Sequence, residues 1–327
     1  MRNVLVTGGT GFIGSNLTAA LLDQGYTVRI LRRSRSDLRA LGSMNVEHLI
    51  GDVRDKNSLR QAMKGCDTVF HTAAVVSYWK KERPFMFDVN VQGTRNVVEV
   101  CLELGVDRLI HTSSIAAIGF PKHGDVADET NLFNWEPYDV GYRNSKYEAE
   151  KEVLRGVTLG LNAVIVNPSV VMGPRDIHFH AGQLIRDIHR KRIFYYVRGG
   201  MNIVYVGDVV RGHILAATYG RTGERYILSG ENLTHRAIIS TIAEIVGGIK
   251  PLFRMPTTAI RVVTFVSEAV ANTLNRRPWV TRELLAGSEL RYHFTCRKAQ
   301  TELGYTFTPF RDAVQETFAW YKSSRLL

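Results

Sequence analysis

The chain opens on the stretch Val4-Leu5-Val6-Thr7-Gly8-Gly9-Thr10-Gly11-Phe12-Ile13-Gly14, which decides its fold. The run from Val4 to Val6 is entirely apolar and predicts a buried strand. Three glycines follow at positions 8, 11 and 14, and residues 15–24 have the apolar spacing of a helix. A strand, a glycine turn and a helix in this order form the context that a dinucleotide site requires.

Each glycine of the turn has its own role in such a site. Gly8 permits the tight turn, Gly11 removes the side chain that would block a pyrophosphate, and Gly14 lets the helix pack close to the strand. The helix offers free N–H groups and the positive end of its dipole to the phosphates. A glycine-rich turn without a ligand is the alternative, which the position between strand and helix disfavours. The residues expected to bind the cofactor here are Gly8, Thr10, Gly11, Phe12, Ile13 and Gly14.

The end of the second expected strand indicates which dinucleotide binds. Arg32 lies eighteen residues after Gly14, where an acidic residue would hold the ribose 2′-hydroxyl of NAD. Arg32 and Arg33, with the hydroxyls of Ser34 and Ser36, suit a 2′-phosphate instead, through charge-assisted hydrogen bonds. A solvated basic loop is the alternative. We therefore expect NADP(H) as the cofactor, with NAD(H) as the other option.

Strand and helix signals alternate over the first half of the chain. This alternation predicts an α/β fold with a doubly wound parallel Rossmann sheet and a smaller mixed α/β C-terminal region. Residues 1–172, with 202–226 returning to them, are expected to form the NADP-binding Rossmann domain, and residues 173–327 mainly the substrate-binding domain. The strands are expected at 27–31, 46–50, 68–71, 108–112 and 162–166, with one long helix at 84–104.

Ligands of such sheets lie at the carboxyl ends of the strands. Asp52, at one such end, has two interpretations: it accepts a hydrogen bond from the adenine amino group, or it caps a helix from Ser58. Small residues after the fourth strand leave room for the cofactor, and a Pro-Ser turn after the sixth is placed to contact nicotinamide. The cofactor residues expected here are Asp52, Val53, Thr72, Ala73, Ala74, Thr112, Tyr142, Lys146, Pro168 and Ser169.

Tyr142 and Lys146 are the main catalytic candidates. They stand four residues apart in a segment of helical composition, and therefore on one helical face. A neighbouring ammonium favours the phenolate form of a tyrosine, and a serine opposite can hold the substrate oxygen. In reduction, the phenol of Tyr142 would donate the proton while the cofactor delivers hydride. Ser113 and Ser114, at the end of the fifth strand, are the candidate serines.

Composition narrows the class of protein. The net charge is +11, but the basic residues are scattered, so we expect ordinary surface charge and no nucleic-acid partner. Three cysteines without paired spacing indicate a reducing compartment, and the absence of a leader or a long apolar run favours a cytoplasmic protein. His178, His180 and His189 fit no zinc pattern, so no metal is expected.

Two apolar features are open to more than one interpretation. Residues 257–275 are expected to cover the substrate cavity or pack in the core, in preference to lying on a membrane surface, because basic residues do not line one clear face. Peripheral membrane contact is therefore not favoured. A second set of residues either lines an apolar substrate pocket or belongs to the core: Val75, Tyr78, Trp79, Phe120 and Phe179.

Taken together, the motifs resemble the extended short-chain dehydrogenase/reductases, of the epimerase/dehydratase superfamily, and within them the dihydroflavonol reductase-like branch. The resemblance implies Ser114, Tyr142 and Lys146 as catalytic residues. In the family a glycine follows the catalytic serine at a fixed distance, and counting back from Gly119 selects Ser114 over Ser113. It also implies an adenine contact at Asp52 and a homodimer through helices near 84–104 and 142–156. The motifs are 7–14, 51–52, 71–74, 90–94, 112–114, Tyr142 with Lys146, and 167–169.

Three activities are compatible with these motifs. The protein is an NADPH-dependent reductase of a ketone or aldehyde on an apolar molecule, a nucleotide-sugar epimerase or dehydratase, or a 3β-hydroxysteroid dehydrogenase-like enzyme. A nucleotide-binding protein without activity is disfavoured by the intact catalytic residues. Nucleotide-sugar members of the family usually carry an arginine seven residues before the aspartate that matches Asp208. Met201 stands there, and a thioether cannot clamp a diphosphate, although Arg198 or Arg211 would offer a substitute. We therefore expect reduction of a small apolar carbonyl compound.

Overall fold

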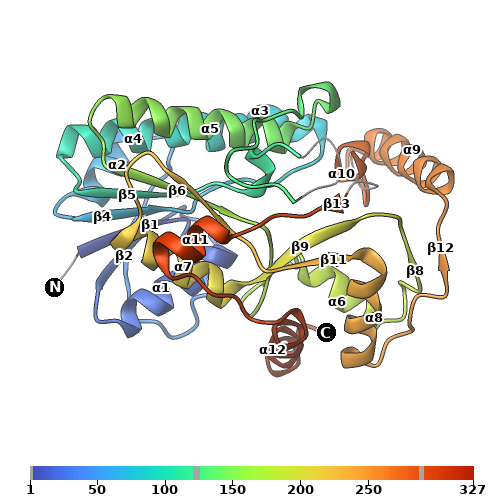
Figure 1. The fold of residues 1–327 in the computed structure, drawn as a ribbon. Helices are drawn as coiled ribbons and strands as arrows, with labels where there is room; N and C mark the ends of the chain where they lie inside the picture. The colour runs from blue at the N-terminus through green and yellow to red at the C-terminus, as the bar shows by residue number, and fades with distance from the viewer. Residues whose placement is uncertain (1–2, 121–125, 287–290) are drawn as a thin grey trace.

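The computed structural model describes residues 3–120, 126–286 and 291–327. Its centre is a seven-stranded parallel sheet in the order β10-β6-β5-β4-β1-β2-β3, which confirms the predicted Rossmann fold (Figure 1). The strand order reverses between β1 and β4, and this switch point is where such sheets bind their ligands. The strands are β1 (Asn3–Thr7), β2 (Thr27–Arg32), β3 (Glu47–Ile50), β4 (Thr68–His71), β5 (Arg108–Thr112), β6 (Ala163–Pro168) and β10 (Arg225–Leu228).

Helices cover both faces of this sheet, as Figure 1 shows. On one face α2, α4 and α5 pack side by side, and on the other α1, α7 and α11 do so. Because both faces are covered, every residue of β4 and β6 is buried, as is typical of parallel strands. The helices are α1 (Phe12–Asp23), α2 (Lys56–Met63), α4 (Gly93–Leu104), α5 (Gly141–Thr158), α7 (Val206–Tyr219) and α11 (Arg297–Leu303).

The long helix expected at 84–104 is not one regular helix. It consists of α3 (Arg83–Phe87), a π-helical turn (Asp88–Gln92) and α4. The side chain of Asn90, in the π turn, forms hydrogen bonds with the backbone of Val75 and with the Ser145 hydroxyl. Local π turns are frequent at functional sites, where they turn a side chain toward a partner outside the helix.

The smaller region is built on a second sheet, in which β9 pairs with β7, β11 and β13. Three helices, α6, α8 and α12, pack with this sheet around a separate apolar core. The elements are β7 (Val170–Met172), α6 (Gly182–His189), β9 (Gly200–Tyr205), β11 (Glu231–Thr234), α8 (His235–Val246), β13 (Arg291–Tyr292) and α12 (Phe310–Ser323).

The chain crosses between the two sheets more than once. β7 lies before residue 173 but joins the smaller sheet, as does β9 at the start of the segment 202–226. The rest of that segment, α7 and β10, lies on the large sheet. The domain boundary at residue 172 therefore stays a prediction.

The last group of elements lies at the edge of the molecule, to the right in Figure 1. β8 (Tyr195–Tyr196) pairs with β12 (Phe253–Arg254), and α9 (Thr257–Leu274) and α10 (Arg282–Leu285) follow. Residues 257–275 were expected to cover the substrate cavity or to pack in the core. The core alternative is wrong, and the cover over the cavity stays a prediction. Only Thr264 and Ala271 of α9 are buried, because the helix turns its small and polar residues inward.

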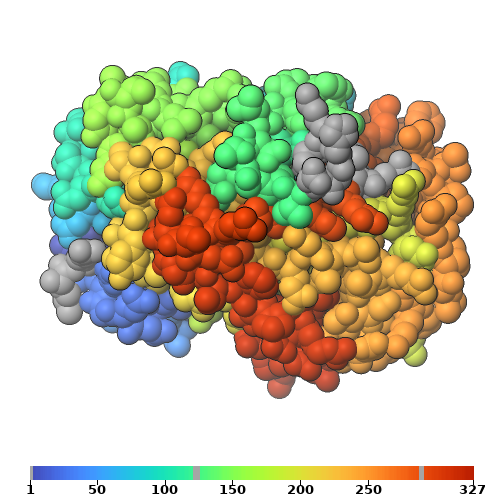
Figure 2. All heavy atoms as spheres, in the orientation of Figure 1, coloured from blue at the N-terminus to red at the C-terminus, as the bar shows by residue number. Residues whose placement is uncertain are grey.

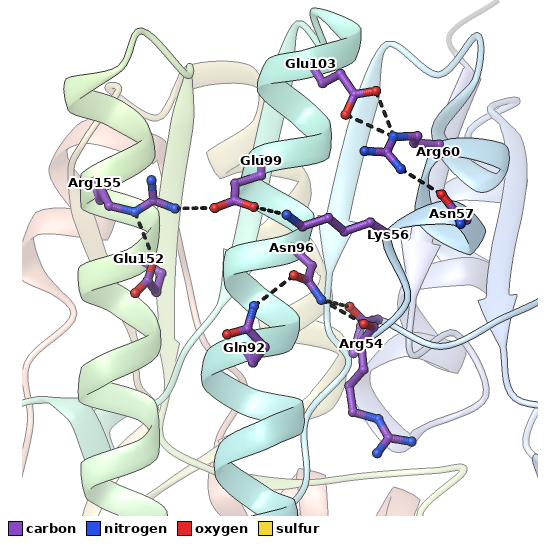
Figure 3. A network of polar contacts seen from close by, with 11 residues as sticks. Arg54, Lys56, Asn57, Arg60, Gln92, Asn96, Glu99, Glu103, Glu152 and Arg155 are labelled. Atoms are coloured by element: carbon purple, nitrogen blue, oxygen red, sulfur yellow. Dashed lines mark hydrogen bonds and ion pairs between the residues drawn. The ribbon is translucent and has the colours of Figure 1, made fainter.

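A network of charged and amide side chains joins α2, α4 and α5 (Figure 3). Glu99 of α4 pairs with Lys56 of α2 at 2.5 Å and with Arg155 of α5 at 3.1 Å. Exposed ion pairs contribute only about 0–1 kcal/mol each. The network therefore sets how these helices lie more than it stabilises the fold. The homodimer expected through the same helices stays a prediction.

Neither a membrane span nor a metal cluster is found in the three described ranges. No helix there is long and apolar enough to cross a membrane. No group of three or more His, Cys, Asp or Glu residues there is placed to hold a metal ion. His178 and His180, which the sequence placed close together, have ring centroids 6.4 Å apart.

Candidate active site

The glycine turn between β1 and α1 has no room for side chains. Gly8 has a φ of 71°, and a Cβ there would lie 2.7 Å from the Cα of Ala73. A Cβ on Gly14 would lie 2.2 Å from the Gly8 carbonyl oxygen, so helix and turn touch directly. Gly11 is the N-cap of α1, and no side chain caps the helix. Its first N–H groups are therefore available to a phosphate.

A cavity runs from this turn along the carboxyl ends of β1, β2, β3 and β4. Ten of the residues that the sequence predicted to bind the cofactor line it. The predicted residues that do not line it are Phe12, Ile13, Gly14, Thr112, Tyr142, Lys146, Pro168 and Ser169. Val75, expected on the substrate side, lies here too. Ser36, whose hydroxyl was expected near a 2′-phosphate, lines the cavity as well. Three lining residues were missed: Leu31 and Gly51, which adjoin predicted residues, and Val89, which does not. The complete lining is Gly8, Thr10, Gly11, Leu31, Arg32, Arg33, Ser36, Gly51, Asp52, Val53, Thr72, Ala73, Ala74, Val75 and Val89.

Arg32, the last residue of β2, and Arg33, which follows it, differ in whether their side chains already have hydrogen-bond partners. Arg32 donates from Nε to Nδ1 of His48 at 3.0 Å, and so lies along β3. Arg33 lines the cavity, and its guanidinium has no hydrogen bond or ion pair within the described residues. Arg33 and Ser36 are therefore free to meet an anion at this end of the cavity, whereas Arg32 is partly committed to the sheet.

Asp52 is not a helix cap. The cap of α2 is Asp55, whose carboxylate accepts from the N–H of Asn57 at 2.9 Å, so α2 begins at Lys56 rather than at Ser58. The carboxylate of Asp52 instead pairs with Arg54 at 2.9 Å, and hydrogen bonds from that guanidinium lower the pKa of Asp52. Asp52 is therefore an anion that faces the cavity, as an adenine contact requires.

These observations fit a dinucleotide. The turn around Gly8 excludes any Cβ, the helix N-terminus is uncapped, and an acidic acceptor and a free arginine stand at the far end of the cavity. The pyrophosphate would lie at Gly11, the adenine near Asp52 and a 2′-phosphate near Arg33.

The catalytic candidates come from two elements that meet beside β5. Ser114 follows β5 and caps a short 3-10 turn, its Oγ accepting from the Ala116 N–H at 3.1 Å. Tyr142 stands in the first turn of α5. Burial raises the pKa of the Tyr142 phenol and the nearby Tyr78 adds to the rise, whereas a hydrogen bond with the Ser114 hydroxyl opposes it. The structure therefore brings Ser114 and Tyr142 together, and the phenol is protonated at neutral pH.

Lys146 lies one turn further along α5 and is only 4% exposed. Its Nζ donates to the carbonyl oxygen of Thr112 at 3.0 Å, which fixes the ammonium below the end of β5. Burial lowers the pKa of Lys146 to about 8, and the carboxylate of Glu150 opposes this shift. The ammonium is thus charged at neutral pH but close to losing its proton. Thr112, predicted to touch the cofactor, holds Lys146 through its carbonyl oxygen and contacts His213 through its hydroxyl at 2.8 Å.

Two asparagines fix the catalytic elements, and the sequence assigned neither a role of its own. Asn90 accepts from the Val75 N–H at 2.7 Å and donates to the Ser145 hydroxyl at 3.0 Å, so it ties the loop after β4 to α5. Asn167 donates to the Ser114 carbonyl oxygen at 3.0 Å and to Glu150 at 2.6 Å. Both belong to motifs that carried the family resemblance, which was the available signal.

Pro168 and Ser169, expected near nicotinamide, stand at the end of β6 and are buried. The hydroxyl of Ser169 has no hydrogen-bond partner within the described residues. The hydroxyl of Ser113 lies beside the buried Glu150 carboxyl group, and their interaction opposes the rise that burial causes in the pKa of Glu150. Ser169 therefore stays a candidate for contact with a ligand, and the roles given to the individual site residues remain predictions.

The aromatic residues expected around the substrate fall into separate places. The Tyr78 ring lies edge-on to Tyr142 with centroids 5.7 Å apart, and so faces the catalytic phenol. Trp79 follows it in the same loop. Phe120 packs on the buried Trp135 at 4.5 Å. Phe179 stacks on Tyr321 of α12 at 4.9 Å, within the core of the smaller region.

Arg198 and Arg211 were named as residues that could bind a diphosphate in place of the missing arginine at position 201, and the structure shows that only one of the two side chains is without partners among the described residues. Met201, on β9, packs partly buried against the core of the smaller region. Arg211 is committed to Asp208 at 2.8 Å and to the Thr306 carbonyl oxygen at 2.6 Å. Arg198 is exposed and remains the one substitute that the sequence named.

A Rossmann sheet that combines this cavity with a serine, a tyrosine and a lysine beside it defines an NAD(P)-dependent dehydrogenase/reductase. The chain belongs to the 3-beta hydroxysteroid dehydrogenase/isomerase family, whose model matches residues 5–231, and thus to the extended short-chain dehydrogenase/reductases. The family resemblance inferred from the motifs is confirmed.

Relatives match over nearly the whole chain. The chain is 37% identical to "Putative dihydroflavonol 4-reductase" from Synechocystis sp., over 97% of this chain and 94% of that protein. It is 32% identical to "Sterol demethylase protein B" from Methylococcus capsulatus, over 99% of each. The crystal structure of gox2253 has a TM-score of 0.87 and 39% sequence identity, and the match covers 100% of both chains.

Proposed function

We propose that this oxidoreductase uses NADPH to reduce a ketone or aldehyde on an apolar small molecule. The observation that carries the proposal is the protonated Tyr142 phenol, which meets Ser114 on one side and the Tyr78 ring on another. The phenol is a proton donor in an environment with an apolar wall, as carbonyl reduction on an apolar substrate requires.

Ser114, Tyr142 and Lys146 would each have a separate role in the reduction. The Ser114 hydroxyl binds the substrate carbonyl oxygen, and Tyr142 transfers its proton to that oxygen as negative charge develops there. The Lys146 ammonium, held by Thr112, stabilises the tyrosinate that remains until water returns a proton to it. A reduced nicotinamide, when bound, supplies the hydride for the carbonyl carbon.

Two features support the substrate class. Met201 cannot clamp the diphosphate of a nucleotide sugar and Arg211 is already committed, so only Arg198 is left to offer the bidentate contact that such a substrate needs. The names of the two relatives, a putative dihydroflavonol reductase and a sterol demethylase protein, refer to a dihydroflavonol and a sterol rather than to a nucleotide sugar. The free Arg33 supports NADPH over NADH.

The test is a panel of aryl ketones, aldehydes, steroids and UDP-sugars, each incubated with purified protein and NADPH or NADH. We expect NADPH oxidation with carbonyl compounds. Tyr142→Phe should lower kcat by about 10²- to 10⁴-fold while the protein still binds NADPH. Turnover of a UDP-sugar without net cofactor oxidation would refute the reductase function. Full activity of Tyr142→Phe would refute the mechanism.

The family match favours a second candidate, oxidation of a 3β-hydroxyl group on a steroid or sterol. The same panel separates the two functions when it is also run with hydroxysteroids and oxidised cofactor. Reduction of the 3-ketosteroid product back to its alcohol would not distinguish them, because both enzymes reduce a ketone in that direction, so the initial rates in both directions decide.

A further inference from the structure

Helix α9 presents its large apolar side chains to solvent. Thr264 and Ala271 are buried, and Ser267 and Glu268, at helical spacing from them, are partly covered. Val262, Val266 and Val270 recur every four residues on the opposite side and are all more than half exposed. An amphipathic helix on a globular protein normally has the reverse orientation.

This exposed surface extends beyond α9. We call it the apolar face. It includes the strand before the helix and the loop after it, where Trp279 is 95% exposed. Figure 1 and Figure 2 place α9 at the outer edge of the molecule, to the upper right. The apolar face consists of Leu252, Phe253, Val262, Val263, Phe265, Val266, Val270, Leu274 and Trp279.

The inner side of α9 is already held by the protein. The Ser267 hydroxyl accepts from the Trp279 N–H at 3.1 Å, and Glu268 pairs with Arg282 at 2.7 Å. Two further contacts join this region to the loop beside the active site: Lys81 with Asn275 at 3.1 Å, and Arg277 with Glu82 at 2.7 Å. With α9 fixed in this way, its apolar side chains face outward, and none of the residues in the described ranges buries them.

The charges around the apolar face identify the occupant. Arg254, Arg261 and Arg276 form no ion pair with any described residue, whereas Glu268 is neutralised by Arg282. Arg261 stands four residues before Phe265 and seven before Glu268, at the border of the apolar face. A second copy would bring like charges together, since the whole chain carries +11. Acyl chains bordered by anionic headgroups match both the apolar side chains and the arginines.

We propose that α9, with Phe253 before it and Trp279 after it, docks this protein onto the surface of a bilayer that contains anionic phospholipid. The helix lies in the interface and does not cross it. Its apolar side chains enter the acyl boundary, its arginines reach the headgroups, and Trp279 lies at the headgroup level, where tryptophan is enriched.

The docking surface is joined by hydrogen bonds to elements of the candidate active site. Glu283 of α10 is buried and accepts from the N–H of Gly141, the first residue of the helix that carries Tyr142, at 2.9 Å. Lys81, in the segment that follows Trp79, contacts Asn275 at the end of α9. Docking itself does not depend on the reaction.

The experiment is flotation of the purified protein with phosphatidylcholine vesicles, with and without phosphatidylglycerol, at low and high salt. We expect binding to the anionic vesicles that weakens with salt. Phe265→Glu should lower the partition coefficient by at least about tenfold. The double substitution of Arg261 and Arg276 by glutamine should lower it roughly fivefold for each arginine. Leu159→Glu, at an equally exposed leucine on the end of α5, should leave it unchanged.

NADPH binding, measured by fluorescence for each variant, shows that the protein is folded, and Val266→Ser provides a second, milder variant. Equal flotation of the wild type and Phe265→Glu, or no flotation of the wild type, overturns the proposal. Elution of the wild type as a dimer that Phe265→Glu makes monomeric, without vesicle binding, assigns the apolar face to a second copy and also overturns it. If the wild type binds the vesicles but reduces none of the carbonyl compounds, the proposed reaction is refuted and the membrane docking still stands.

Discussion

Replacing Arg33 with alanine tests how the chain selects its cofactor. The Arg33 guanidinium lines the nucleotide cavity near enough to Asp52 to help lower the pKa of that carboxyl group. It forms no hydrogen bond or ion pair with the described residues, so it is available to a 2′-phosphate. A charge-assisted hydrogen bond contributes about 1.5–3 kcal/mol. Because Arg33 is exposed to solvent, we expect the lower end of this range, a rise of about tenfold in the KM for NADPH.

The assay compares initial rates with NADPH and NADH for the wild type, Arg33→Ala and Arg32→Ala. The KM for NADH should stay the same in Arg33→Ala, since NADH has no 2′-phosphate. Arg32→Ala is the matched control: its Nε is committed to His48, so its effect on the NADPH to NADH ratio should be smaller. An unchanged ratio in Arg33→Ala would show that this arginine does not meet the phosphate.

Three further predictions concern the groups that hold the site together. Burial lowers the pKa of Lys146 to about 8, so kcat for reduction should fall as the pH rises through that value and the ammonium is lost; a profile that stays flat up to pH 10 contradicts this role. Gly14→Ala places a Cβ against the Gly8 carbonyl oxygen, so it should lower the free energy of unfolding in urea by about 1–3 kcal/mol and weaken NADPH binding. Wild-type values of both quantities would contradict the close approach of α1 to the glycine turn. Asn90→Ala leaves Val75 and Ser145 without their partner and should cost about 1–3 kcal/mol, which thermal unfolding measures; no loss would mean that water replaces the amide.

Much of the nucleotide-binding half was predictable from the sequence because its determinants are local. The turn at Gly8 and Gly14 follows from adjacent residues, and the buried strands follow from short apolar runs. The sequence could not show that Arg32 is committed to His48 and Arg33 is not, because these contacts depend on how β2 pairs with β3. One interpretation placed the cap of α2 at Asp52, but the cap is Asp55, which accepts from Asn57 two residues further on; this contact is local, so a correct helix start would have identified it.

The sequence by itself determined the Rossmann sheet, the glycine turn and the spacing of Tyr142 and Lys146, since each depends on residues within a few turns of chain. Tertiary structure alone decided which side of α9 faces the protein. Apolar periodicity shows that a helix has an apolar side but not whether that side meets a core or solvent. The contacts of Ser267 and Glu268 with the following loop hold the polar side of α9 against the protein. The apolar side of a segment that was expected to cover the cavity or pack in the core is therefore exposed.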